Sequence, residues 1–246
     1  MTKLNSIVKF LNKELKVKSI KDKSKNGLQV RASENINKVG LATDACMDVF
    51  KKAKKLKCGL VIAHHGLFWK NLRDVSNVTK DRVRFLKKNK ISVYASHLPL
   101  DKHIKYGNNA EIFKLLNAKP KELFGEVGYL GYLEDARNLD SIVKELNKKL
   151  DAKCKVLKFG KSKIKKIAVV SGYGAPDVLE AIKKKVDLFI TGETSHVYYD
   201  DAEEGKMNVI FAGHYKTETL GIKALGPLLK KKFGLKTVFI DSPTGL

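Results

Sequence analysis

The chain has 246 residues and carries 49 lysines and arginines against 26 aspartates and glutamates, a formal net charge of +23. Apolar residues make up 43% of this length, enough to bury a sizeable core, which excludes intrinsic disorder as the main description. The sequence shows no run of about 18 apolar residues and no C-x-x-C pair, which excludes a transmembrane helix, a disulfide framework and a zinc knuckle. We expect residues 1–16 to form an amphipathic helix and not a secretory signal.

The first half of the chain predicts alternating helices and buried strands. Amphipathic spacing marks the helices, and short apolar runs bounded by turn or polar residues mark the strands. In chain order the elements are a helix over 3–15, a short apolar run at 28–30, a strand over 39–43, a helix over 46–57, a strand over 59–63, a helix over 79–89 and a strand over 91–95. This alternation predicts an α/β layer with largely parallel pairing.

The second half begins with a predicted strand over 125–133, whose residues alternate as in an exposed antiparallel strand. Helices and strands then continue to alternate. In chain order there follow a helix over 139–150, strands over 153–159 and 167–171, a helix over 176–185, and strands over 186–191, 207–212 and 236–241. We therefore expect two α/β domains with largely parallel or mixed sheets, residues 1–124 and 125–246. No serine- or proline-rich linker marks the boundary, and the C-terminal segment could return to the first domain.

An internal repeat relates the two halves. A shift of 128 residues lays 38–65 over 166–193, and both segments have the pattern of strand, small-residue turn, basic helix and strand. A shift of 117 residues then lays 95–101 over 212–218, and each copy carries a histidine and a carboxylate four residues apart. Generic patterning would explain the first match alone, whereas the recurring histidine and carboxylate favour duplication.

Four of the six histidines lie within two residues after the end of a predicted buried strand, namely His64, His65, His97 and His214. Ligands of open α/β sheets bind at this edge, so we expect a site in the cleft between the two domains. On extended backbone His64 and His65 point in opposite directions, which suits one ligand with one packed residue, or two ligands for two ions. Asp101 and Glu218 each follow a histidine by four residues, so each pair shares a face if the segment is helical.

These side chains offer imidazole nitrogens and carboxylate oxygens without thiolates. That donor set suits Zn, Mn, Fe or Co and does not favour a closed structural zinc site. With at least three histidines and two carboxylates, two adjacent ions fit as well as one. His97 is then a ligand, a general acid or base, or a side chain that orients a ligand.

Five motifs in order resemble the Nif-three-like family, also called GTP cyclohydrolase I type 2 homologues: NGLQV (26–30), AHHGLFW (63–69), SHLPLDKHIKYGNN (96–109), TGETSH (191–196) and GHYKTE (213–218). The resemblance runs from residue 26 to the terminal FIDSPTGL. It implies a two-domain α/β fold, two divalent metal ions per chain and a ring-shaped homohexamer. Many relatives carry an inserted domain between the halves, for which 246 residues leave no room.

The same resemblance implies a set of metal ligands, matched motif by motif: His64, His65, Asp101, His214 and Glu218. It makes Glu218 the bridge between the two ions. His97 matches a family position close to the metals but outside the usual ligands, so we take it as the catalytic candidate.

Three further residues are candidates for lining the cleft or orienting a ligand. Glu193, the repeat partner of His65, orients a ligand or caps a helix. Asp44 follows the first strand of the repeat and lines the cleft or caps the next helix. His196, with Tyr198 and Tyr199, lines the cleft and stacks a base, or belongs to the core.

The predicted site favours a metal-dependent hydrolase acting on a small phosphorylated or nucleotide-like substrate, because the cationic chain would attract anions. GTP ring opening is implied by the family name alone, and the sequence contains no P-loop motif. We expect a cytoplasmic location without a membrane partner, since three scattered cysteines favour a reducing compartment.

Two other functions remain open. One is a nucleic-acid-binding or regulatory hexamer with structural metals, since +23 per chain would bind nucleic acid non-specifically. Only five of the 49 cations are arginines, however, and the lysines are spread along the chain, which is typical of a solvated surface. The other is a metal-storage or metal-delivery protein.

Overall fold

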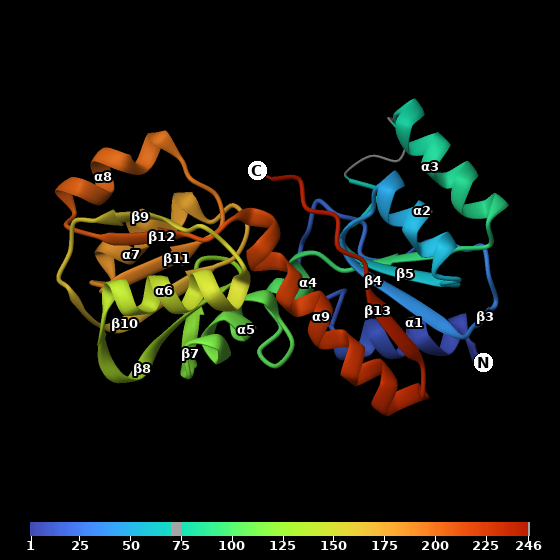
Figure 1. The fold of residues 1–246 in the computed structure, drawn as a ribbon, viewed down its shortest axis with the longest axis horizontal. Coiled ribbons are helices and arrows are strands. Elements are labelled where there is room, and N and C mark those ends of the chain that lie inside the picture. The colour runs from blue at the N-terminus through green and yellow to red at the C-terminus, as the bar shows by residue number, and fades with distance from the viewer. Residues whose placement is uncertain (70–74, 246) are drawn as a thin grey trace. The chain divides into compact units, whose positions relative to one another are not determined.

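The computed structural model describes residues 1–69 and 75–245 (Figure 1). These residues form a mixed α/β structure with two main sheets, which confirms the predicted fold class. Within the described ranges, no helix combines the length and the hydrophobicity needed to cross a bilayer.

The chain divides into two compact units. The first comprises Met1–Leu100 and Ile222–Pro243, and the second comprises Asp101–Gly221 with the residues after Pro243. The division falls at Leu100/Asp101 and not after residue 124 as expected. The reason is that β7 (Ala118–Phe124) pairs in antiparallel fashion with the strand that follows it, so it belongs to the second sheet.

The first unit is built on a five-stranded sheet in the order β13-β4-β5-β6-β2. Neighbouring strands are parallel except for β2, which runs antiparallel to β6 at the edge. The strands are β2 (Gly27–Val30), β4 (Lys38–Asp44), β5 (Leu60–His65), β6 (Ser92–Ala95) and β13 (Lys236–Phe239), beside a separate pair of β1 (Thr2–Lys3) and β3 (Asn35–Ile36). The pairing of β13 with β4 returns the C-terminal segment to the first unit.

Amphipathic helices supply the rest of the first core. Their bounds are α1 (Leu4–Glu14), α2 (Met47–Lys55) and α3 (Asn77–Lys88), close to the predicted helices. α1 turns Leu4, Ile7 and Leu11 inward, a spacing of three and four residues that places them on one face. α2 buries Val49 and Phe50, while its lysines lie on the outer face. A short helix, α4 (Leu98–Asp101), follows β6.

The second unit has a six-stranded mixed sheet in the order β7-β8-β10-β11-β12-β9. β10, β11 and β12 are parallel, and the strands on either side of them are antiparallel. Besides β7, the strands are β8 (Gly128–Asn138), β9 (Lys155–Lys158), β10 (Lys163–Val170), β11 (Leu188–Thr191) and β12 (Asn208–Phe211).

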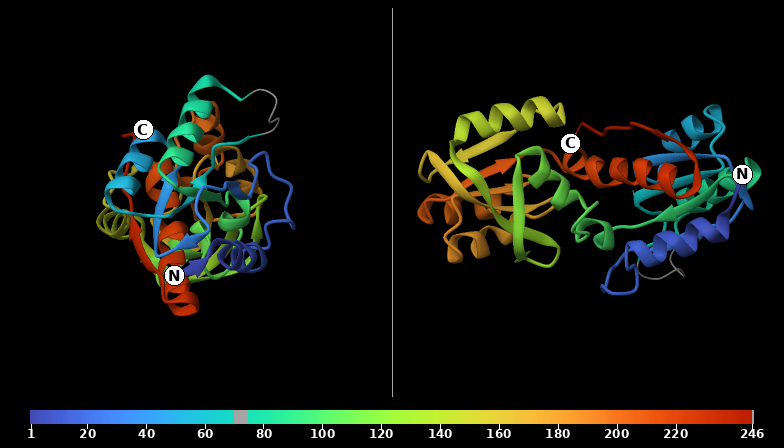
Figure 2. Two further views of the ribbon diagram at one scale, coloured as in Figure 1. Left: turned by 90° about the vertical axis from the view of Figure 1, so that its right-hand side faces the viewer. Right: turned by 90° about the horizontal axis from the view of Figure 1, so that it is seen from below.

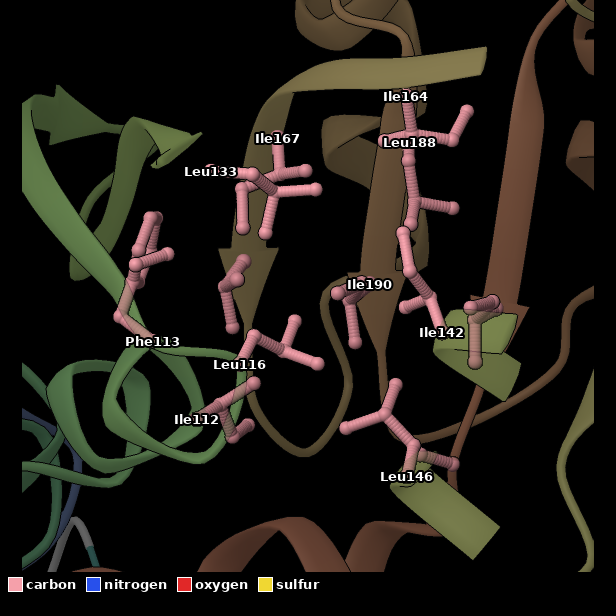
Figure 3. Close-up of a cluster of buried hydrophobic side chains, with 14 of the residues drawn as sticks. Ile112, Phe113, Leu116, Leu133, Ile142, Leu146, Ile164, Ile167, Leu188 and Ile190 are labelled. Atoms are coloured by element: carbon pink, nitrogen blue, oxygen red, sulfur yellow. The ribbon is translucent and has the colours of Figure 1, made fainter. Parts of the chain in front are cut away.

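Helices cover both faces of the second sheet. α5 (Asn108–Leu115) and α6 (Leu139–Leu150) pack on one face around a large apolar cluster (Figures 2 and 3). α7 (Val178–Lys183) and α8 (Tyr199–Glu204) pack against a second cluster. Each of these two helices follows a short 3-10 turn, η2 (Ala175–Asp177) and η3 (His196–Tyr198). The long helix α9 (His214–Phe233) begins in the second unit and ends in the first.

The internal repeat is visible in the strand register. β4 pairs with β5 so that Val39 faces Leu60, and β10 pairs with β11 so that Ile167 faces Leu188, which is the same register after a shift of 128 residues. The third strands are offset by one residue, because Ala63 faces Ala95 whereas Thr191 faces Phe211. The second copy accommodates its extra residue at Gly213, whose φ is +88°.

Candidate metal-binding residues

Three histidines of the first unit meet at the carboxyl ends of neighbouring parallel strands. His64 and His65 end β5, and His97 follows β6 by two residues. The ring centroids of His64 and His65 are 4.7 Å apart, and that of His97 lies 5.1 and 5.5 Å from them. One ring nitrogen of each lies within 4.8 Å of the other two. Both adjacent histidines therefore face the cluster, which favours two ligands over one ligand and one packed residue.

Each of these rings is oriented by a hydrogen bond from Nδ1 to an oxygen. The acceptors are the Ser96 carbonyl for His64 (3.0 Å), Asp44 Oδ1 for His65 (2.8 Å) and Asp22 Oδ1 for His97 (2.9 Å). Because a carbonyl or carboxylate oxygen only accepts, Nδ1 carries the proton and the lone pair of the neutral ring lies on Nε2. Metal-ligating histidines are commonly held in this way.

Asp22 is a buried carboxylate that sequence reasoning did not single out. Burial raises its pKa, but hydrogen bonds from His97, from Asn26 and from the backbone N–H of Ser24 outweigh that effect and lower the pKa to about 2. Its second oxygen also accepts from the backbone N–H of Leu98, at 3.0 Å. Asp22 is therefore an anion at neutral pH and fixes both the His97 ring and the start of α4.

In the second unit, His214 and Glu218 face one another on the first turn of α9. The two residues are one helical turn apart, and His214 Nε2 lies 3.0 Å from Glu218 Oε2. On the other side of the ring, Nδ1 contacts Glu193 Oε1 at 2.5 Å. Glu193 thus orients His214 as Asp44 orients His65. At the end of the second strand of the repeat, the first copy has a histidine (His65) where the second copy has a carboxylate (Glu193).

Two glycines beyond β10 and β11 make room for this turn of α9. Gly172 has a φ of +64°, and a Cβ there would lie 2.1 Å from Glu218 Oε1. A Cβ at Gly192 would lie 2.8 Å from the backbone of α9. Under the shift of 128 residues these glycines stand where the first copy has Asp44 and His64. The second copy therefore lacks those side chains because the helix occupies their space.

A buried polar network holds Asp101. Asn108 Nδ2 and Ser171 Oγ both donate to Asp101 Oδ1, at 2.8 and 3.1 Å. Asn108 Oδ1 accepts in turn from the backbone N–H of Gly221 in α9, at 2.7 Å. A carboxylate oxygen of Asp101 lies within 4.8 Å of one of Glu218. The network thereby ties Asp101 to the helix that carries Glu218.

The remaining sequence candidates have different surroundings. Asp44 orients His65 and does not cap α2, whose N-cap is Cys46. His196 is exposed on η3, and among the described residues it belongs to no cluster of potential metal ligands. Tyr199 packs edge-on against Phe159, with ring centroids 5.5 Å apart. The exposure of His196 argues against a place in the core, and its expected role in lining the cleft stays a prediction.

Residues 2–245 match the Duf34/NIF3 (NGG1p interacting factor 3) family. The chain belongs to this family. It is 44% identical to a protein of Pyrococcus abyssi named "GTP cyclohydrolase 1 type 2 homolog", with 98% of each chain covered. A protein of the same name from Pyrococcus horikoshii is 46% identical, with 98% of this chain and 99% of the relative covered.

Solved structures show the same fold as this chain. A Thermus thermophilus protein superimposes with a TM-score of 0.90 at 36% sequence identity, and all of both chains is covered. The family match over residues 2–245 confirms the resemblance seen in the five motifs.

Proposed function

We propose that this Duf34/NIF3 protein is a metal-dependent hydrolase that uses His64, His65, Asp101, His214 and Glu218 to hold two divalent ions. The observation that carries the proposal is the orientation of the imidazoles, because all three histidines in that set direct Nδ1 at a carbonyl or carboxylate oxygen. The donor set fits Zn, Mn, Fe or Co, since it supplies only nitrogen and oxygen.

The proposed substrate is small and phosphorylated or nucleotide-like. The name of the Pyrococcus relatives, "GTP cyclohydrolase 1 type 2 homolog", supports a nucleotide. The net charge of +23 supports an anionic substrate, because a cationic surface raises the local concentration of anions and their rate of association.

In such a site the ions would act as Lewis acids toward water and the substrate. The chain itself supplies His97 for proton transfer. Its Nδ1–H donates to the anion of Asp22, so Nε2 is left to accept a proton and return it. The His97 side chain is 19% exposed whereas His64 is fully buried, so water and substrate reach His97 more easily.

Elemental analysis of the purified protein, followed by a nucleotide and phosphoester screen with the identified ion, tests this proposal. We expect about two ions per chain and turnover of at least one compound. His64→Ala and Glu218→Ala should lose metal and turnover, whereas His97→Ala should keep metal and lose turnover. The control His196→Ala, an exposed residue outside the ligand clusters, should keep both. Less than one ion per chain contradicts the metal site, and bound metal without turnover indicates storage or delivery.

A groove along α1 favours the second candidate function, nucleic-acid binding by a hexamer with structural metals. The groove is lined by Lys9, Lys13, Lys16 and Lys18 together with uncharged residues. Lysines in such a groove would neutralise phosphates, so affinity should fall steeply between about 50 and 200 mM salt. Substitutions that reverse the charge of these lysines should abolish nucleic-acid binding and leave metal content intact. Sedimentation of the wild type tests the hexamer.

A further inference from the structure

Trp69 is the single tryptophan of the chain, and it lies beside the histidine cluster of the first unit. Its ring centroid is 5.0 Å from that of His97, with the planes at 69°, and 6.0 Å from that of His65. The residue nevertheless remains 40% exposed. An aromatic surface is thus available to a ligand next to the proposed proton-transfer residue.

The indole is held in place by its own turn. Its Nε1 donates to the carbonyl of Gly66 at 3.0 Å, so the polar edge of the ring is already satisfied. The turn is fastened through Gln29, whose Oε1 accepts from the backbone N–H of Leu67 at 2.6 Å and whose Nε2 donates to the carbonyl of Lys25 at 2.7 Å. A ring fixed before binding loses little conformational entropy when a ligand stacks on it.

Gly66 is required for this anchoring. A Cβ at residue 66 would lie 2.3 Å from Gln29 Nε2 and 2.7 Å from the side chain of Ala95. The absence of a side chain lets the chain turn tightly after β5, and the turn then returns Trp69 to the histidines. The AHHGLFW motif therefore supplies two candidate ligands and one aromatic surface within six residues.

We propose that Trp69 is the recognition surface for a planar heteroaromatic ring of the substrate, the chemical class of a nucleobase. This inference rests on the proposed hydrolase function and specifies its substrate. Nucleobases stack on exposed aromatic side chains through their π faces. A base on Trp69 would lie next to His97, where a proton can be transferred.

The chemistry of the indole favours a ring over a bare phosphate. Trp69 carries no charge, and its one hydrogen-bond donor, Nε1–H, is already directed at the carbonyl of Gly66. A phosphate therefore finds neither a charge nor a free donor on this side chain, whereas a neutral base finds a π face to stack on. The phosphates of a nucleotide would be left to the proposed metal ions.

Tryptophan fluorescence reports on this one residue, because the chain has no other tryptophan. Guanosine, adenosine and ribose 5-phosphate should be titrated into the metal-loaded and the chelator-treated protein. We expect both nucleosides to quench the fluorescence and ribose 5-phosphate to leave it unchanged. By calorimetry, Trp69→Leu should weaken nucleoside binding about 5- to 150-fold, the loss of one base stack, and Trp69→Phe should restore most of it.

A matched control is Tyr132→Ala, since Tyr132 is a similarly exposed aromatic residue (39%) on β8. The nucleoside affinity of this variant should equal that of the wild type. Wild-type nucleoside affinity in a folded, metal-loaded Trp69→Leu variant would overturn the inference, as would equal quenching by ribose 5-phosphate. If nucleosides bind through Trp69 but no compound is hydrolysed, the proposed hydrolase fails and the recognition surface stands. Hydrolysis with an unchanged KM in Trp69→Leu overturns the recognition surface alone.

Discussion

Gly172 and Glu218 share a space that admits only one side chain, because a Cβ on Gly172 would lie 2.1 Å from Glu218 Oε1. Glu218 is 3% exposed, so it has little freedom to move aside. Gly172 also has a φ of +64°, which L side chains rarely adopt. The turn after β10 is therefore shaped around the Glu218 carboxylate, which we propose as a metal ligand.

Gly172→Ala tests this relationship. The substitution adds backbone strain of about 1–2 kcal/mol and a steric clash of about 1–3 kcal/mol, so the free energy of unfolding should fall by roughly 2–5 kcal/mol. The displaced carboxylate should also lower metal content. Urea denaturation and elemental analysis measure the two effects.

Gly234→Ala is the matched control. Gly234 has nearly the same φ, +67°, but a Cβ there would meet nothing within 4 Å. This variant should show the strain without the clash and should keep its metal. Equal destabilisation of the two variants, with equal metal content, would contradict the role assigned to Gly172.

Asp177 should make the stability of the protein pH-dependent. Burial raises its pKa to about 6, and the charges of Glu180 and Glu126 add to the shift. The folded chain holds the proton of the Asp177 carboxyl more tightly than the unfolded chain does. The stabilising contribution of this protonated carboxyl is therefore complete below the unfolded pKa of 3.8 and is lost as the pH rises through about 6. Asp177→Asn should therefore raise Tm at about pH 8 and change little at about pH 4.

Thermal unfolding across that pH range measures the effect. Asp135→Asn, which removes an exposed carboxylate from β8, is the control and should leave the pH dependence of Tm unchanged. An Asp177→Asn variant that keeps the wild-type loss of stability above about pH 6 would show that another group is responsible.

Asp22 makes the opposite contribution to the pH dependence of stability. Its folded pKa of about 2 lies below the unfolded value of 3.8, so it stabilises the fold above about pH 3.8 and this contribution is lost as the pH falls through about 2. Asp22→Asn should lower the free energy of unfolding by about 2 kcal/mol at neutral pH, with the difference vanishing in acid. Urea midpoints against pH test this. Asp135→Asn, at an exposed carboxylate of β8, should change the midpoints little.

The strands that deliver the histidines could be predicted from the sequence. Buried parallel strands read as continuous apolar runs, so the runs before His64 and His97 marked both the strands and the edge where they end. The repeat also predicted the shared register of Val39–Leu60 and Ile167–Leu188. The local pattern is sufficient here because each of these strands is composed mainly of apolar residues, which indicates burial without reference to any other segment.

Other features depend on contacts between distant segments. α9 contains Gly221, Gly226 and Pro227, which argue against a 20-residue helix, but Leu225 and Leu229 on it are fully buried and packing stabilises it. Asp22 lies in a lysine-rich turn 75 residues before His97, and no local pattern marks it as a partner. The one-residue offset at Gly213 is likewise invisible in an ungapped comparison.

Asn108 is the residue whose substitution should separate positioning of Asp101 from general stability. It donates to Asp101 Oδ1 and accepts from the backbone N–H of Gly221, and it is completely buried. Asn108→Ala should lower the free energy of unfolding by about 1–3 kcal/mol, because buried polar groups lose their partner. It should also weaken metal binding about 10- to 100-fold, the usual effect of removing a group that orients a ligand.

Asn208→Ala provides the comparison that decides between these effects. Asn208 is also completely buried in the second unit and donates to the carbonyls of Lys161 and Asp187, but none of its partners is a candidate ligand. Both variants should be destabilised, and metal titration of the folded proteins should show weakened binding for Asn108→Ala alone. Equal metal affinities in the two variants would mean that Asn108 only supports the fold. Weakened metal binding in Asn108→Ala alone would show that Asn108 orients Asp101, since both variants remove a completely buried asparagine.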